Sequence, residues 1–180
     1  MRVKEKFTKK LLVEGNDDQH VIWALCEKFK VAETFDIIDC EGIDKLNEQI
    51  PVRFKQSGID TLGIIIDADT EIKNRWTSLK GLLSAQGFAV PDDLPPTGLV
   101  LKSEANLKVG VWIMPNNNLN GMLEDFISFL VPKEDKLLPI VHSVYSHQSV
   151  PVILIKVYHP SLGKIDTHPL TKSTPILSQN

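Results

Sequence analysis

Acidic residues follow two of the hydrophobic runs in this sequence. They are Glu14, Asp17 and Asp18 after the run KKLLV, and Asp67 and Asp69 at the end of the run GIII. Four carboxylates brought together without a cation would repel one another strongly, and a bound cation turns that repulsion into affinity. Carboxylate oxygens suit the hard ions Mg²⁺ and Mn²⁺ better than Zn²⁺. The sequence therefore predicts a Mg²⁺ or Mn²⁺ site with Glu14, Asp18, Asp67 and Asp69 as ligands.

The spacing within each motif fits this prediction. Glu14 and Asp18 are four residues apart across a strand-to-helix turn, so Asp18 can fold back over the strand end. Asp67 and Asp69 point the same way if the strand continues through both of them. Asp17 is an additional candidate ligand.

Each acid also has an ordinary structural interpretation. Asp17 or Asp18 would serve as a helix N-cap, and Asp69 with Thr70 would cap a helix that begins near 71. For a single residue, capping is at least as good an explanation as metal binding. The occurrence of several acids at the ends of two strands of one sheet favours metal binding over capping. Asp39 and Glu41 belong equally well to the rim of the site or to a solvated loop.

The elements that must position these acids alternate along the chain. Strand patterns cover 8–14, 35–40 and 60–67, and helix patterns cover 17–30, 43–57 and 71–86. This order predicts an α/β fold with a mostly parallel, Rossmann-like sheet and helices on both faces. The Ile run before Asp67 predicts a strand that is buried on both faces. Ligands bind at the carboxyl ends of such strands, where the acids lie.

The remaining chain predicts a loop at 88–98 and a hairpin of strands 99–103 and 108–114. Helices at 119–131 and 134–147, a last strand at 150–158 and a loosely ordered tail at 159–180 follow. The segments with strand and helix patterns are expected to form one domain, residues 8–158. Trp23, Trp76 and Trp112 lie in apolar patterns and are expected in the core.

Several polar residues near these elements have two interpretations. Asn118 fits an N-cap, and Asn116 is a candidate contact for phosphate or metal-bound water. Glu124 and Asp125 lie in a helix, where we expect one to face solvent and Glu124 to face the site. Lys73 and Arg75 follow the second motif, where helix surface is the default and phosphate contact the alternative.

Composition limits the classes of function. The net charge of −3 does not support nucleic-acid binding by charge alone, although a metal ion can supply positive charge at a phosphate. No apolar run reaches the roughly 20 residues that span a bilayer, so no membrane partner is expected. Cys26 and Cys40 have no CxxC spacing and are expected as free thiols, which predicts a cytoplasmic location. No P-loop, GxSxG, GxGxxG or HExxH motif is present.

The two acidic motifs resemble those of a known domain. LLVEGNDD is similar to the first motif of the Toprim domain and IIIDADT to the second, while the EGxxD spacing resembles the overcoming-lysogenization-defect (OLD) nucleases. The stretch VGVWIMPNNNLNGMLEDFI resembles DUF3226, a family of small bacterial stand-alone Toprim-like proteins. The likeness runs from about residue 8 to about residue 157.

The resemblance implies a Toprim fold and assigns roles to residues. Glu14 would be a metal ligand or general acid/base, and Asp67 and Asp69 the metal-binding DxD pair. Asp18 would be the extra acid of the OLD-type motif. Glu124 and Asp125 match an acidic pair of the small family.

This chain also departs from the family pattern. Asn116 stands where an acid is expected. From His159 onward nothing matches the expected Trp-containing segment, as a truncation or frameshift would produce, and the late lysine of OLD-type enzymes has no counterpart.

Three functions remain open. The first is a Mg²⁺-dependent phosphodiesterase or nuclease acting on DNA or RNA. The second is a non-catalytic Toprim module that binds metal, nucleotide, nucleic acid or a protein, which the departures favour. The third, a receiver-like domain, lacks the expected lysine after a fifth strand. Oligomeric state is open, a dimer included.

Overall fold

The structure, a computed structural model, describes residues 5–131. These residues belong to the first of two units, residues 1–150, and the second unit, residues 151–180, lies outside the described part. The helix expected at 134–147, the strand expected at 150–158 and the tail from 159 also lie outside the described residues.

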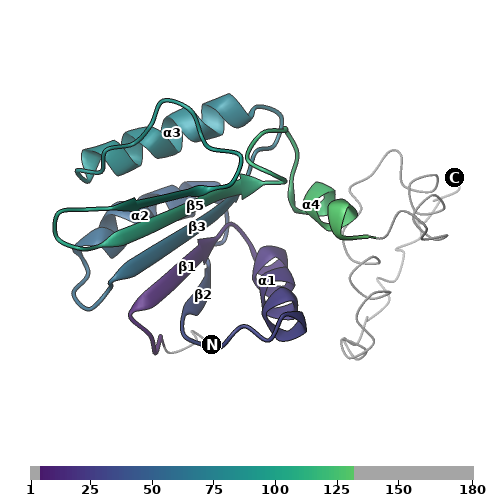
Figure 1. Cartoon of the computed structure of the whole chain (residues 1–180), viewed down its shortest axis with the longest axis horizontal. Coiled ribbons are helices and arrows are strands. Elements are labelled where there is room, and N and C mark those ends of the chain that lie inside the picture. Colours follow the sequence, from purple (N-terminus) through teal and green to yellow (C-terminus); the bar gives the residue numbers. More distant parts are fainter. Residues whose placement is uncertain (1–4, 132–180) are drawn as a thin grey trace, which may run out of the picture. The chain divides into compact units, whose positions relative to one another are not determined.

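A five-stranded mixed sheet forms the centre of the described part, with the strand order β2-β1-β3-β5-β4 (Figure 1). Its strands are β1 (Lys9–Val13), β2 (Asp36–Asp39), β3 (Thr61–Asp67), β4 (Leu99–Lys102) and β5 (Lys108–Met114). All neighbouring strands are parallel except β4 and β5, which pair antiparallel as the expected hairpin. The prediction of an α/β fold with a mostly parallel sheet is confirmed.

Four helices accompany the sheet in the described residues. They are α1 (Asn16–Lys28), α2 (Ile43–Lys55), α3 (Ile72–Ala85) and α4 (Leu123–Leu130). Figure 1 shows α1 and α3 on opposite sides of the sheet, so helices cover both faces, as expected for parallel crossovers. Because β1, β3 and β5 are parallel neighbours, their carboxyl ends lie at one edge of the sheet.

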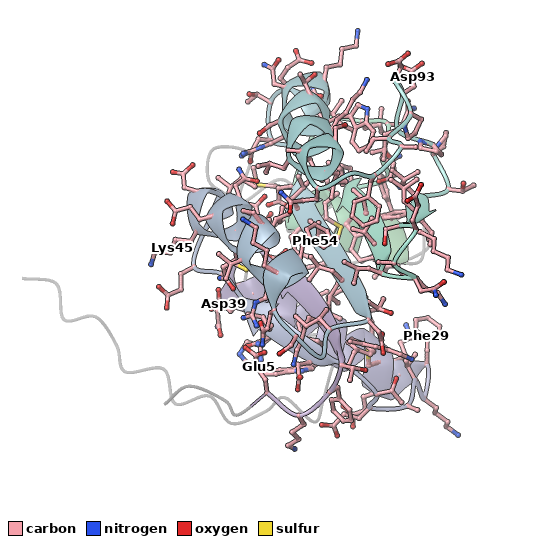
Figure 2. All side chains as sticks on the ribbon, turned by 90° about the vertical axis from the view of Figure 1, so that its left-hand side faces the viewer. Glu5, Phe29, Asp39, Lys45, Phe54 and Asp93 are labelled. Carbon is pink, nitrogen blue, oxygen red and sulfur yellow. The ribbon has the colours of Figure 1, made fainter. Side chains whose placement is uncertain are left out.

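The main core lies between the sheet and the α2–α3 layer. Leu62, Ile64 and Ile66 of β3 are almost completely buried in it. The alternate residues of the strand are only half-buried, so the expectation of burial on both faces is wrong for β3. On the helix side, Phe54 of α2 contacts Phe88, with ring centroids 5.2 Å apart (Figure 2). Pro51 lies inside α2, which continues through it to Lys55.

Two further expectations differ from the structure. The last described helix begins at Leu123 rather than at 119, because 115–121 forms turns with a left-handed Asn117 (φ 60°). Trp76 is buried, but Trp23 is 44% exposed on α1, so its assignment to the core is wrong. The outer side of α1 carries Trp23 with the His20 ring packed edge-on against it. No helix within residues 5–131 is long and apolar enough to cross a membrane.

Candidate functional site

A hollow of 380 Å³ opens at the carboxyl ends of β1 and β3, beside the first turns of α1 and α4. Its lining residues are Glu14, Gly15, Asn16, Asp17, Asp18, Gly42, Asp67, Met122, Leu123 and Glu124. Five of these ten are acids, and none is Lys, Arg or His. Sequence segments far apart in the chain thus bring an uncompensated negative charge to one place.

Glu14 follows the last residue of β1 and reaches across to the neighbouring strand. Its Oε1 accepts a hydrogen bond of 2.8 Å from the backbone N–H of Asp67. Its own carbonyl accepts one of 2.7 Å from the N–H of Gly42. Burial raises the pKa of the Glu14 carboxyl, although the hydrogen bond from Asp67 and the charge of Arg75 oppose that rise. Glu14 therefore links β1 to β3 and is poised to hold a proton.

Asp18 occupies the third position of α1 and folds back, as the spacing predicted. Its Oδ2 accepts a hydrogen bond of 3.0 Å from the N–H of Gly15, the N-cap residue. The side chain thereby closes the helix end while lining the hollow, so the capping and site interpretations both describe it. Burial raises its pKa to about 6, with further contributions from the charges of Asp17 and Glu124.

Asp67 ends β3 and is the most strongly perturbed acid of the hollow. Its Oδ1 is buried and has no hydrogen-bond partner. Burial, followed by the charges of Asp18 and Glu14, raises its pKa to about 8. A buried oxygen without a donor is costly, and a cation or a proton would satisfy it.

Asp69 does not line the hollow. The strand ends at Asp67, and Asp69 takes a left-handed backbone conformation with φ 52°, so the two side chains do not continue one strand face. The Asp69 Oδ2 instead forms an ion pair with Nη2 of Arg75 on α3. Its charge still raises the pKa of Asp67 and of Glu14.

The remaining candidates divide into two groups. Asp17 and Glu124 line the hollow. Asp125 is exposed, and its Oδ2 accepts a hydrogen bond of 2.9 Å from the N–H of Met122 at the start of α4. Asn116 also lies outside the lining, where its Oδ1 accepts hydrogen bonds from the backbone of Asn118 and Leu119.

The acids after β2 and the N-cap expected at Asn118 also lie away from the hollow. Asp39 accepts a hydrogen bond from the N–H of Glu41, and Glu41 pairs with Lys45. The N-cap of α4 is Met122 rather than Asn118.

A connection between two loops was not expected from the sequence. Asp69 and Gly121 exchange two backbone hydrogen bonds of 2.8 Å. Asn120 accepts from the N–H of Ile72 at 2.9 Å and donates to the carbonyl of Thr70 at 2.6 Å. This junction attaches the segment before α4 to the turn before α3. The NNNLNG stretch predicted a turn, but not that this turn would be hydrogen-bonded to the turn before α3.

The donor set fits a hard divalent cation by its chemistry. It consists of carboxylates, includes the unpartnered Asp67 Oδ1, and lies beside the positive dipole ends of α1 and α4. Within residues 5–131, no three His, Cys, Asp or Glu side chains are already arranged to hold a metal ion. Glu14, Asp18 and Asp69 each have a partner within the protein at one carboxylate oxygen.

Comparison with known proteins gives one match. A protein-family model, described as a protein of unknown function (DUF3226), matches residues 8–150. Neither the curated proteins nor the solved structures give a match. The match spans both acidic motifs, the whole described sheet and the residues that line the hollow. The chain therefore belongs to the DUF3226 family.

Proposed function

We propose that this chain is a Toprim-type protein, related to the OLD nucleases, that uses Mg²⁺ or Mn²⁺ to act on phosphodiester bonds of DNA or RNA in the cytoplasm. The observation that carries the proposal is the buried, unpartnered Oδ1 of Asp67 in a hollow lined by five acids. Such a cluster is unfavourable unless a bound cation or protonation relieves its charge.

The lining residues suggest a division of roles. Glu14, Asp18, Asp67 and Asp69 would hold the ion, Asp69 after giving up its pair with Arg75. The charge of Glu124 acts on Asp67 and Asp18. A bound Mg²⁺ would supply charge stabilisation at the phosphate and an activated water. Alternatively, Glu14 would serve as the general acid/base in place of a metal ligand: its Oε1 is held by the Asp67 N–H, so it would carry the proton at Oε2.

The first test is calorimetric titration of Mg²⁺ and Mn²⁺ into the wild type and Asp67→Ala/Asp69→Ala. We expect binding to the wild type and none to the double variant. A matched control, Asp93→Ala/Glu104→Ala, removes the same charge from exposed positions and should bind as the wild type does. Figure 2 shows Asp93 at the edge of the molecule. Absence of binding to the wild type would refute the metal site.

The pH dependence of that titration is a second, independent measure. Asp67 has a pKa of about 8 and must lose its proton when the ion binds. Affinity should therefore rise by up to about tenfold per pH unit between pH 6 and pH 8. Protons should be released on binding, seen as a dependence of the measured heat on the buffer.

Catalysis is tested separately from binding. Single- and double-stranded DNA and RNA are incubated with the wild type and with Glu14→Gln, with Mn²⁺ and with EDTA. Mn²⁺-dependent cleavage that Glu14→Gln abolishes would support the nuclease.

The alternative is a non-catalytic Toprim module that binds metal, nucleotide, nucleic acid or protein. It is favoured by Asn116 in place of the expected acid and by carboxylates that already have internal partners. Metal binding without cleavage of any of the four nucleic acids would support the module.

A further inference from the structure

Arg75 is the cation that interacts with this acidic cluster from outside the hollow. It lies on the first turn of α3, and its guanidinium pairs with the carboxylate of Asp69. The Arg75 side chain is 25% exposed and that of Asp69 is 40% exposed, so water only partly screens the pair. The charge of Arg75 also opposes the rise in the pKa of Glu14, so Arg75 acts electrostatically on a residue that lines the hollow.

The backbone of Asp69 is fixed, so its side chain is the part that can move. Two hydrogen bonds to Gly121 hold the residue in its left-handed conformation. Asn120 holds the next part of the turn through Thr70 and Ile72. In this structure the Asp69 carboxylate meets Arg75, and its charge still raises the pKa values of Asp67 and Glu14.

We propose that Arg75 is a positioning residue that keeps Asp69 paired and outside the hollow, so that a divalent ion must compete with Arg75 for the Asp69 carboxylate. This inference rests on the proposed function, since it requires that the hollow binds a divalent ion. In the metal-free protein Arg75 compensates the charge of Asp69. In the metal-bound protein Asp69 joins the ion and the pair with Arg75 is broken.

The test is a calorimetric titration of Mn²⁺ into four full-length proteins at pH 8. They are the wild type, Arg75→Gln, Asp69→Asn and the double variant. Removing the competitor should tighten binding, so Arg75→Gln is expected to lower the Kd by about threefold, the size typical of a partly exposed ion pair. In the Asp69→Asn background there is no carboxylate to compete for, so Arg75→Gln should change the Kd by clearly less, leaving only the effect of its charge on Glu14.

Two controls separate this effect from a general change of charge or fold. Lys73→Gln removes one positive charge from an exposed position on the same turn of α3 and should leave the Kd unchanged. Arg75→Lys keeps the charge but loses the planar fork, so its Kd should fall between those of the wild type and Arg75→Gln. Circular dichroism melts establish that each variant is folded. If Arg75→Gln does not fold, Arg75→Lys decides, and a Kd equal to that of the wild type refutes competition.

The possible results distinguish two kinds of failure. If no protein in the series binds Mn²⁺, the metal site of the proposed function is refuted and this inference with it. If the wild type binds and Arg75→Gln binds equally or more weakly, the metal site stands and only the competition is refuted. If Arg75→Gln tightens binding equally with Asp69→Asn present, Arg75 acts through space and not through Asp69, which also refutes it.

Discussion

At the scale of single residues, Asp67 is the least stable feature of the metal-free protein. Its pKa is raised from an ordinary 3.8 to about 8, first by burial and then by neighbouring acids. Between these two pH values the unfolded chain releases this proton while the folded chain keeps it. Folding stability attributable to Asp67 therefore falls as pH rises from about 4 to 8 and is constant above that range.

Replacement of Asp67 by Asn should stabilise the metal-free protein in a pH-dependent manner. The amide removes the buried charge, so the gain should be near zero at pH 4 and largest at pH 8 and above. We expect roughly 1 to 3 kcal/mol there, the usual cost of an uncompensated buried polar group. The measurement is thermal unfolding in EDTA from pH 4 to pH 9.

Asp93→Asn serves as the control for this series because Asp93 is exposed. Its unfolding curve should follow that of the wild type at every pH. A metal-free Asp67→Asn protein that is no more stable than the wild type at pH 9 would contradict the assignment of strain to Asp67.

At the scale of elements, the junction between the turn before α3 and the segment before α4 holds the site together. Asn120→Ala removes both side-chain hydrogen bonds across it and leaves the N–H of Ile72 without its acceptor. We expect a loss of about 1 to 2 kcal/mol in the free energy of unfolding. Faster hydrogen exchange at Ile72 should accompany it.

The matched control for the junction is Asn118→Ala, which changes an exposed Asn two residues away. It should alter neither the unfolding free energy nor exchange at Ile72. Equal effects of the two variants would show that the junction contributes no specific stability.

Gly121 belongs to the same junction and should not tolerate a side chain. Its φ is 138°, and a Cβ there would lie 2.5 Å from Oδ2 of Asp125. Gly121→Ala should therefore destabilise the protein by about 2 kcal/mol or more, from backbone strain and from this collision. Urea unfolding measures the loss.

Gly58→Ala separates the two causes, because Gly58 also has a positive φ (84°) but nothing lies within 4 Å of its Cβ position. It should lose less stability than Gly121→Ala. Asp125→Ala alone loses the hydrogen bond from the Met122 N–H, so the collision is measured by comparing Gly121→Ala in the Asp125→Ala background and in the wild type. Equal losses in the two backgrounds would mean that backbone strain alone is responsible.

At the scale of the whole molecule, a partly buried ion-pair network joins β1, β2, α2 and the segment before β1. Lys10 has a side chain only 4% exposed and pairs with Asp36 at 2.6 Å and with Glu5 at 3.1 Å. Arg53 of α2 completes the network through Glu5, which Figure 2 shows beside these elements. Burial acts to raise the pKa of Glu5, but the hydrogen bonds from Arg53 and Lys10 outweigh it, so this pKa is lowered. The pKa of Asp36 is likewise lowered against the effect of burial, by its hydrogen bond from Lys10.

Lys10→Met should destabilise the protein by roughly 3 kcal/mol at pH 7, because it leaves Asp36 without its buried cation and Glu5 with Arg53 alone. The lowered pKa values mean that the network stabilises the fold above pH 4 and that this contribution is lost as pH falls. The difference between wild type and variant should therefore shrink below pH 4 in thermal unfolding. Lys9→Met, at the exposed neighbouring position, should have little effect. A constant difference at all pH values would contradict the electrostatic explanation.

The sequence predicted the elements well because apolar runs and turn residues alternate clearly within residues 8–114. It also predicted that Glu14 and Asp67 meet, since the carboxyl ends of parallel strands share an edge. The pair Asp69–Arg75 could not be predicted. It depends on a left-handed residue and on a separation of six positions, which the regular spacing of a helix does not bring together.

Other features of the site depend on the packing of distant segments. The contribution of Met122, Leu123 and Glu124 to the hollow follows from the junction at Gly121, which no local pattern encodes. Trp23 lies in an apolar helix pattern, yet α1 packs mainly against β1 and β2 and leaves this ring exposed.

The position of the β4–β5 turn has a practical consequence. Lys108 at the start of β5 pairs with Thr61, whereas Met114 at its end pairs with Asp67. Six residue steps of about 3.3 Å therefore place the turn roughly 20 Å from the acids. Ala105 at its tip is exposed, while burial raises the pKa of Cys26 and raises that of Cys40 to about 12. A thiol introduced by Ala105→Cys would thus be the preferred point for a dye or a surface tether, with the hollow left facing free solution.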